Sequence, residues 1–363
     1  MTILDPTVDL LQQMVRIPSV SGEEEASRDH LAGWLDAHGI RPTLHGRNVL
    51  AVVEGERPGP SLLLCSHIDV VPVGPGWTRD PWDGAIEGDR LHGRGSNDAK
   101  SSVAAMAVAA TRLAGGPFAG RLVLAFVCDE ETGGEGLEVC GDQLPDLDAA
   151  VVGEPTELDV CPGQRGLLRA SLVAHGRSCH ASRPHEGVNA VEIAARDVLA
   201  LGGLDLGEAH PLLGRATLQA TVIEGGTRPN VIPGECVVQL DGRPTPDCDN
   251  ERMLARLDEA TESEVVVKST RLRPVATRED ARIVTLARAA SPTGKVRGFG
   301  GVSDMAHLAG LPAVVMGPGT SVQSHAPDES VGLDHVTAAT EAYLSIARSF
   351  LVEEAVTPTG APS

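Results

Sequence analysis

Apolar positions recur at helical spacing near the start of the chain and then give way to short apolar runs. Val8, Leu11 and Val15 fall on one face of a predicted helix. Ser21 and Glu24 have the spacing of a capping box, which predicts that a second helix begins there. Beyond these helices, strand-like runs alternate with helical stretches, and the runs include 48–53, 61–65, 121–128, 149–152 and 313–316. This alternation predicts an α/β layered domain.

The order of elements changes between about residues 166 and 272. Helical and strand-like patterns follow one another there as strand, helix, strand, strand, helix, strand, which is the order of a ferredoxin-like module. We therefore expect an inserted α+β domain at 166–272, with 1–165 and 273–363 together forming the catalytic domain. The segment 357–363 is rich in Pro, Gly and Thr and is expected to be disordered.

Composition excludes several classes of function. The 363 residues are 42% apolar, as in soluble globular proteins, and no apolar run approaches the roughly 20 residues that a membrane helix needs. The seven cysteines lie far apart and form no CxxC pair, which argues against a disulfide framework or a thiolate zinc site. A formal charge of −20 repels nucleic acid and anionic membranes. The N-terminus lacks a signal-peptide pattern, so we expect a cytoplasmic protein.

Acidic and histidine side chains collect just after the predicted strands of the first domain. The positions are His67 and Asp69 after 62–65, Glu130 and Glu131 after 122–128, Glu154 after 151–152, and His325 downstream of 314–316. If these strands are parallel, all of these groups meet at one edge of the sheet, where open α/β folds place their sites. Imidazole and carboxylate groups without thiolates suit zinc, cobalt or manganese.

The spacing of these residues suggests which of them could be metal ligands, which could orient a ligand and which could be a general base. Asp69 can accept the second ring N–H of His67 and thereby fix its tautomer. Asp98 lies in a Gly-rich turn that opens a helix, where a carboxylate could bridge two metal ions. Side chains of neighbours in extended chain point in opposite directions, so one of Glu130 and Glu131 fits a ligand and the other a general base. Each feature alone is ordinary, for example Asp98 as a helix N-cap, but jointly they predict a metal site.

Seven motifs carry a resemblance to one known family. They are Ser66-His67-Ile68-Asp69-Val70-Val71-Pro72, Gly93-Arg94-Gly95-Ser96-Asn97-Asp98-Ala99-Lys100, Asp129-Glu130-Glu131, Gly153-Glu154-Pro155-Thr156, Cys179-His180-Ala181-Ser182, Asn230-Val231-Ile232-Pro233 and Ser324-His325. Over nearly its whole length, the chain resembles the dinuclear zinc metallo-deacylases and exopeptidases, which include acetylornithine deacetylase, succinyl-diaminopimelate desuccinylase, aminoacylase and glutamate carboxypeptidase. The resemblance implies a zinc-exopeptidase-like catalytic domain with a mostly parallel central sheet, and a ferredoxin-like lid and dimerisation domain.

The resemblance also implies a division of roles around two divalent metal ions, zinc first, with cobalt and manganese as alternatives. By similarity, His67 and Glu154 hold one ion, Glu131 and His325 hold the other, and Asp98 bridges them. Glu130 would be the general base that takes a proton from metal-bound water and passes it to the leaving amine. The family has a cis peptide bond after the bridging aspartate, here Asp98-Ala99.

Further matches concern the inserted domain and the substrate. The family counterpart of His180 reaches across a dimer interface to stabilise the tetrahedral oxyanion, which implies a catalytic homodimer. Arg165, Asn230, Arg243 and Gly301 match positions that line the substrate pocket, and an arginine there could grip a substrate carboxylate. For each arginine, an ordinary surface position is an equal alternative.

The expected substrate is a small N-acyl amino acid. Val302 stands where desuccinylases usually have threonine in Gly-Gly-Thr-Ser-Asp, which disfavours a succinyl group. Segments 211–214, 317–321 and 324–329 resemble the acetylornithine deacetylase branch, so we expect deacetylation of N-acetyl-L-ornithine in arginine biosynthesis. A desuccinylase, a metallo di- or carboxypeptidase and a catalytically silent relative remain alternatives. A serine hydrolase and a zincin are disfavoured, because neither Gly-x-Ser-x-Gly nor His-Glu-x-x-His occurs.

Overall fold

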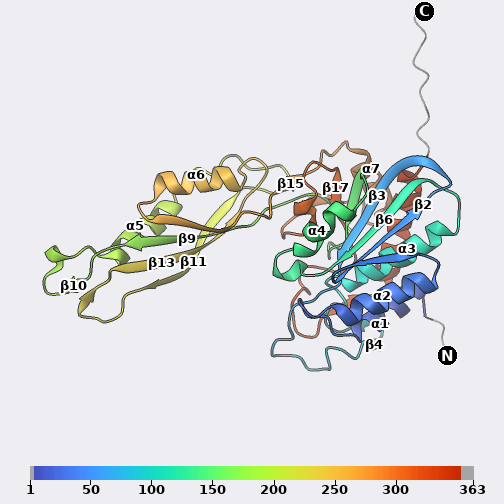
Figure 1. Cartoon of the computed structure of the whole chain (residues 1–363), viewed down its shortest axis with the longest axis horizontal. Helices are drawn as coiled ribbons and strands as arrows, with labels where there is room; N and C mark the ends of the chain where they lie inside the picture. The colour runs from blue at the N-terminus through green and yellow to red at the C-terminus, as the bar shows by residue number, and fades with distance from the viewer. Residues whose placement is uncertain (1–3, 353–363) are drawn as a thin grey trace, which may run out of the picture. The chain divides into compact units, whose positions relative to one another are not determined.

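The computed structural model describes residues 4–352, which form two compact units (Figure 1). Unit 2 comprises Gly163–Ala276 and Gly298–Val302, and unit 1 comprises the other described residues. The boundaries expected at 165/166 and 272/273 lie within a few residues of these. Residues 298–302 also belong to unit 2, which was not expected. The segment 357–363, for which disorder was predicted, lies outside the described residues. The lid and dimerisation role of unit 2 stays a prediction.

Unit 1 is built on a mixed, mostly parallel sheet. Its strands, in spatial order, are β1 (Pro42–His45), β2 (Asn48–Glu54), β6 (Ala119–Val127), β3 (Arg57–His67), β7 (Ala149–Val152), β17 (Ala313–Val315) and β8 (Val160–Gln164), with β15 (Val275–Ala276) and β16 (Val296–Phe299) paired to β8. The central strands β6, β3, β7 and β17 run parallel to their neighbours in this series. Residues 62–65 of β3 are fully buried, as expected for a parallel strand covered on both faces.

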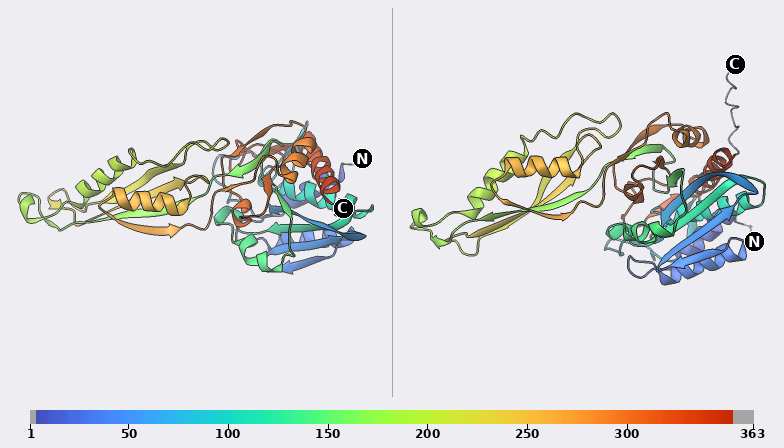
Figure 2. Two further views of the ribbon diagram at one scale, coloured as in Figure 1. Left: turned by 90° about the horizontal axis from the view of Figure 1, so that it is seen from above. Right: turned by 45° about the horizontal axis from the view of Figure 1, so that its top comes forward.

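Helices pack against this sheet, as the two views of Figure 2 show. They are α1 (Pro6–Val15), α2 (Glu25–Ala37), α3 (Lys100–Ala114), α4 (Glu135–Cys140), α7 (Arg282–Ala290) and α8 (Leu333–Phe350). The prediction for the first helix is confirmed, because Val8, Leu11 and Val15 are all buried in the core of unit 1. Helix α3 contacts β3 and packs against α1 and α8. No helix among residues 4–352 is long and apolar enough to cross a membrane.

The predicted capping box is not formed. Helix α2 begins at Glu25, and the side chain of Glu24 makes no cap hydrogen bond. Ser21 Oγ instead donates to Asp69 Oδ2 at 2.7 Å, and Glu24 is fully buried against residues from elsewhere in the chain. Glu24 keeps one local contact, accepting the N–H of Gly22 at 3.0 Å, but the pairing of Ser21 with Glu24 that a capping box requires is absent.

Unit 2 has the predicted strand-helix-strand-strand-helix-strand order. Its elements are β9 (Leu168–His175), α5 (Ala190–Leu201), β11 (Thr217–Gly225), β13 (Glu235–Arg243), α6 (Asn250–Ala260) and β14 (Glu264–Ser269). The antiparallel sheet has the order β11-β13-β9-β14, and both helices lie on one of its faces (Figure 1). A two-stranded ribbon, β10 (Cys179–His180) with β12 (Val231–Ile232), was not predicted. Unit 2 has its own apolar core, which includes Leu172, Leu240 and Met253.

Candidate active site

The parallel strands of unit 1 bring the predicted metal-binding side chains together. β3 ends at His67, β6 is followed by a short 3-10 turn that begins at Glu130, and Glu154 lies two residues after β7. The Asp98 carboxylate lies between two imidazoles, with Oδ1 3.3 Å from Nε2 of His67 and Oδ2 3.7 Å from Nε2 of His325. His67, Glu130 and Glu154 therefore follow the carboxyl ends of neighbouring strands, and the Asp98 turn and His325 lie against them.

The remaining carboxylates join one imidazole or the other. Glu154 Oε1 lies 3.9 Å from Nε2 of His67, and Glu131 Oε2 lies 2.8 Å from Nε2 of His325. Ligand atoms of His67, Glu130 and Glu154 lie within 4.8 Å of one another, as do those of His67, Asp98 and Glu131. All five predicted metal ligands and the predicted base are therefore in one cluster.

The cluster is buried on the His67 side, half exposed at His325, and carries more negative charge than its neighbours balance. His67, Asp98 and Glu154 are 1%, 8% and 6% exposed. Burial, together with the neighbouring carboxylates, holds the pKa values of Glu130 and Glu154 well above the ordinary range. Among the described residues, no lysine or arginine forms an ion pair with these carboxylates. Buried carboxylates need a compensating cation, and the imidazole and carboxylate donors suit a divalent metal ion.

A second acidic cluster in unit 1 is not a candidate metal site. Glu24, Cys128 and Asp129 also place ligand atoms within 4.8 Å of one another. Arg47, however, forms ion pairs with both Glu24 and Asp129. The guanidinium already supplies the positive charge that the His67 cluster lacks.

Asp69 contacts His67, as expected, and also atoms that were not expected. The backbone carbonyl of Asp69 lies 3.0 Å from Nδ1 of His67, whereas its carboxylate oxygen lies 3.5 Å away, so the carbonyl is the closer acceptor for the ring. The fully buried carboxylate also accepts the backbone N–H groups of Glu130 at 3.1 Å and Glu131 at 3.2 Å. Asp69 thus ties the strand end that bears His67 to the turn that bears both glutamates.

The turn that carries Asp98 is held by residues that sequence reasoning missed. Oε1 of the buried Glu329 accepts the backbone N–H groups of Asn97 at 2.9 Å and Asp98 at 3.0 Å. Its Oε2 accepts a 2.6 Å hydrogen bond from the buried guanidinium of Arg94. The peptide bond between Asp98 and Ala99 is cis, as the resemblance implied. Nothing in the sequence pairs Arg94 with a glutamate 235 residues away.

Asp304 is a further buried acid that was not predicted. Its side chain is 1% exposed, and Oδ1 has no hydrogen-bond partner among the described residues. Burial raises the pKa of Asp304 to about 7. The only signal for it was its place in the Gly300-Gly301-Val302-Ser303-Asp304 motif.

The other predicted residues belong to unit 2. His180 is exposed in β10, with Nδ1 2.7 Å from Ser182 Oγ. Arg165 donates to the carbonyl of Leu213 at 2.6 Å, and Arg243 makes a two-bond ion pair with Asp241. The carbonyl of Asn230 accepts the N–H of Ala181, and Gly301 lies beside Phe299. Their predicted substrate and oxyanion roles stay predictions.

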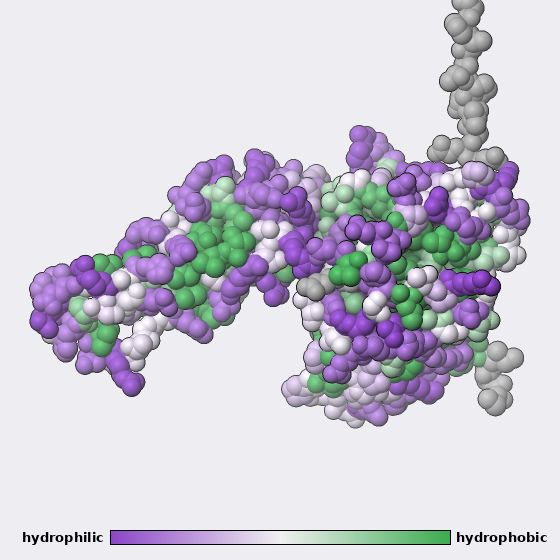
Figure 3. Space-filling model, in the orientation of Figure 1, coloured by the Kyte–Doolittle hydropathy of each residue, from purple (hydrophilic) through white to green (hydrophobic). Residues whose placement is uncertain are grey.

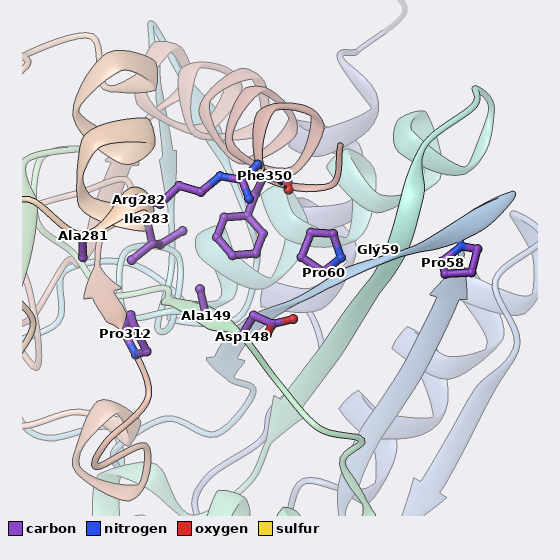
Figure 4. A pocket seen from close by; sticks show the side chains of 10 residues that line it. All are labelled: Pro58, Gly59, Pro60, Asp148, Ala149, Ala281, Arg282, Ile283, Pro312 and Phe350. Atoms are coloured by element: carbon purple, nitrogen blue, oxygen red, sulfur yellow. Dashed lines mark hydrogen bonds between the residues drawn. The ribbon is translucent and has the colours of Figure 1, made fainter. Parts of the chain in front are cut away.

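Figure 4 shows a cavity of about 710 Å³ in unit 1, and none of the residues that line it belongs to the acidic cluster. Its lining includes Pro60, near the start of the buried part of β3, Ala149, the first residue of β7, and Pro312, which precedes β17. It therefore lies at the amino edge of the parallel strands, opposite the cluster. The convergence of ionisable groups, rather than cavity size, identifies the candidate active site.

The sequence is similar to proteins named as peptidases and as a desuccinylase. The family model for peptidase family M20/M25/M40 matches residues 63–349. A peptidase M20 domain-containing protein from Schizosaccharomyces pombe is 35% identical, over 72% of this chain and 66% of the relative. A probable carboxypeptidase from Aspergillus terreus is 35% identical, over 63% of this chain and 58% of the relative. A succinyl-diaminopimelate desuccinylase from Leptothrix cholodnii is 29% identical, over 89% of this chain and 93% of the relative.

Solved structures share the fold. An M20 family metallo-carboxypeptidase from Sulfolobus solfataricus superposes with a TM-score of 0.79 at 20% identity, over 96% of this chain and 99% of the other. A dinuclear metal-binding peptidase of the M20 family from Bacillus subtilis gives a TM-score of 0.74 at 16% identity, over 95% and 97% of the two chains. The α/β fold with a separate antiparallel domain is therefore that of M20 peptidase structures.

Proposed function

Because this chain belongs to peptidase family M20/M25/M40, we propose that it is a metal-dependent hydrolase of an amide bond in a small peptide or N-acylated amino acid. The observation that carries this proposal is the largely buried cluster of two imidazoles and four carboxylates, Asp98 among them, which no lysine or arginine among the described residues neutralises. A reaction that needs no cation would gain nothing from so costly an arrangement of buried charge.

The cluster would hold two divalent metal ions. His67 and Glu154 would bind one ion, Glu131 and His325 the other, and Asp98, whose two oxygens face the two imidazoles, would bridge them. The Bacillus subtilis protein is a dinuclear metal-binding peptidase with the same fold, which supports a pair of ions. The donor set suits zinc, with cobalt and manganese as alternatives. Bound metal ions would polarise the scissile carbonyl and lower the pKa of water.

The protein's own groups would then orient and move protons. Glu130 is the residue left over from the two metal pairs, and its carboxylate lies next to Glu154 and His67. We assign it as the general base that accepts the proton of the attacking water and returns it to the leaving amine. Asp69 would keep Glu130 and Glu131 in place through their backbone N–H groups.

The similar proteins favour peptide-like substrates over N-acetylornithine. They include a probable carboxypeptidase and a desuccinylase, and the substrate expected from the sequence, N-acetyl-L-ornithine, has no specific support among them. Of the carboxypeptidase and desuccinylase activities, the second is disfavoured, because Val302 stands where desuccinylases usually have the threonine that would bond a succinyl group. A peptide with a free C-terminal carboxylate is therefore the first substrate to test. Arg165 and Arg243 are the proposed carboxylate contacts, and a place in arginine biosynthesis and in the cytoplasm stays a prediction.

A homodimer through unit 2 remains part of the proposal. Strands β11 and β14 are the edges of its four-stranded sheet. Apolar residues gather on this unit in Figure 3, and the exposed ones on the edge strands are Val222, Ile223, Val266 and Val267. Exposed apolar edge strands favour pairing with another chain. His180 would supply its oxyanion contact in such a dimer.

The test compares zinc- or cobalt-loaded protein on a short peptide, N-succinyl-diaminopimelate and N-acetylornithine, with and without chelator. We expect chelator-sensitive release of a C-terminal residue. Glu130→Gln should lose turnover by at least about 100-fold, the scale of a general base, while keeping both metal ions. Glu87→Gln, at an exposed glutamate paired with Arg79, is the matched control. Hydrolysis that persists in Glu130→Gln removes this residue from its role, and a metal-replete protein inert on all three substrates supports a silent relative.

A further inference from the structure

Arg47 joins two acidic residues that lie far apart in the sequence. It lies in the turn between β1 and β2 and forms ion pairs with Glu24 and Asp129. Its Nη1 donates to both carboxylates, and Nη2 donates a further hydrogen bond to Asp129. The Glu24 side chain is fully buried, while those of Asp129 and Arg47 are 17% and 26% exposed. Partly buried, multiply bonded pairs of this kind hold a fixed geometry better than exposed ones.

Asp129 is the residue immediately before the proposed base. Its backbone is left-handed, with φ 58°, a conformation that few non-glycine residues adopt without support. Its N–H donates to Oε1 of Glu24 at 3.3 Å, and its carbonyl accepts the N–H groups of Thr132 and Gly134. The side chain and backbone of Asp129 together fix the start of the turn that carries Glu130 and Glu131.

The other side of the same turn is tied to the same N-terminal segment. Asp69 accepts the N–H groups of Glu130 and Glu131, and Ser21 Oγ donates to Asp69 Oδ2. Ser21 N also donates to the carbonyl of Val70. Ser21 and Glu24 therefore connect one short segment to both carboxylates that hold the glutamate turn.

From these contacts we propose that Arg47, acting with Glu24 through Asp129, is a positioning residue that sets the placement of Glu130 and Glu131. The inference rests on the proposed function, since it assigns these glutamates to a metal-dependent hydrolysis. Arg47, Glu24 and Ser21 all precede residue 63, where the match to the family begins, so the family comparison assigns them no role.

Arg47 touches neither imidazole of the cluster, so its loss should act on geometry rather than on substrate binding. A misplacement of about 1 Å in a reacting group can cost roughly 100-fold in rate. We therefore expect Arg47→Met to lower kcat by about 10- to 100-fold while KM stays within about 2-fold. Arg47→Lys retains the charge but not the forked geometry and should recover only part of the loss.

A double variant separates positioning from general stability. In Arg47→Met alone, Glu24 is left as an unpaired buried carboxylate, which destabilises the fold. Glu24→Gln/Arg47→Met removes that lone charge and should recover most of the thermal stability. It should not recover kcat, because Asp129 still lacks its ion pair with Arg47. Recovery of kcat together with stability would show a purely structural role and overturn the proposal.

Arg112→Met is the matched control. Arg112 also joins two acidic residues, Asp5 and Glu341, and its side chain is 34% exposed, but it lies in the last turn of α3, away from the cluster. We expect it to retain the wild-type kcat.

Hydrogen exchange decides the inference even if the proposed function fails. In metal-loaded protein, the amides of Glu130 and Glu131 should exchange at least about 10-fold faster in Arg47→Met than in wild type, since opening of the turn costs less. They should be unchanged in Arg112→Met. If exchange in Arg47→Met is unaltered, the positioning role is overturned, whatever the substrate proves to be. If the wild-type protein is inert on every substrate but exchange is faster in Arg47→Met, only the proposed function is overturned.

Discussion

Glu329→Ala should remove the central acceptor beneath the Asp98 turn. The carboxylate is fully buried and accepts three hydrogen bonds, from Arg94 at 2.6 Å and from the N–H groups of Asn97 and Asp98 at 2.9 and 3.0 Å. Its removal leaves the guanidinium of Arg94, which is 2% exposed, without its ion-pair partner. Breaking a buried pair in this way costs about 3–5 kcal/mol.

The free energy of unfolding of unit 1 can be measured selectively. Trp34, Trp77 and Trp82 are the three tryptophans of the chain, and all lie in unit 1, so their fluorescence reports its unfolding in urea. The experiment is run in excess chelator, because metal binding would add its own stabilisation. For a domain of this size, about 3–5 kcal/mol corresponds to a drop in Tm of roughly 6–20 °C.

Two further variants bracket the expected loss of stability. Glu87→Ala breaks the ion pair between Arg79 and the exposed Glu87, and should cost no more than about 1 kcal/mol. Arg94→Met/Glu329→Leu removes both charges and should recover part of the loss, but not the part due to the two backbone N–H groups. If Glu329→Ala lies within about 1 kcal/mol of wild type, as an exposed pair would, the buried pair does not hold the turn.

Other predictions follow from single contacts. His325→Ala should reduce the bound metal from two ions per chain to one, as counted by elemental analysis, because only Glu131 and the shared Asp98 would remain for the second ion; retention of two ions would show that His325 is not a ligand. Leu64→Ala, in the fully buried centre of β3, should cost about 2–5 kcal/mol in urea unfolding, and a smaller loss would contradict the tight packing of the sheet. Burial lowers the pKa of His30, so the native state binds a proton at this residue less readily than the unfolded state does. The free energy of unfolding is therefore unaffected by His30 above the unfolded pKa of about 6.5 and decreases as the pH drops below it. Relative to wild type, His30→Leu should therefore gain stability between pH 7.5 and 5.5 in urea titrations, and a pH-independent difference would refute this account.

The candidate site could be read from the sequence because parallel strands impose a simple rule. His67, Glu130 and Glu154 each follow a buried apolar run, and parallel pairing of those runs brings their ends to one edge. Only the order of strands and the direction of pairing were needed, so residues far apart in the chain could be placed together. The resemblance to a known family then assigned roles that spacing alone left open between Glu130 and Glu131.

The supporting contacts could not be predicted in this way. Local spacing gave Ser21 and Glu24 a capping box, yet in the folded chain Ser21 donates to Asp69 and Glu24 pairs with Arg47. The pair of Arg94 with Glu329 likewise joins residues 235 positions apart.

The sequence by itself therefore determined the first helices, the central strands, the order of elements in the inserted module and the predicted ligands at the sheet edge, because periodicity and strand ends are local properties of the chain. The tertiary structure decided which buried charge each arginine meets and which atoms hold the glutamate turn. Those contacts depend on distances of a few ångströms between segments that only the packed core brings together, so local sequence patterns do not predict them.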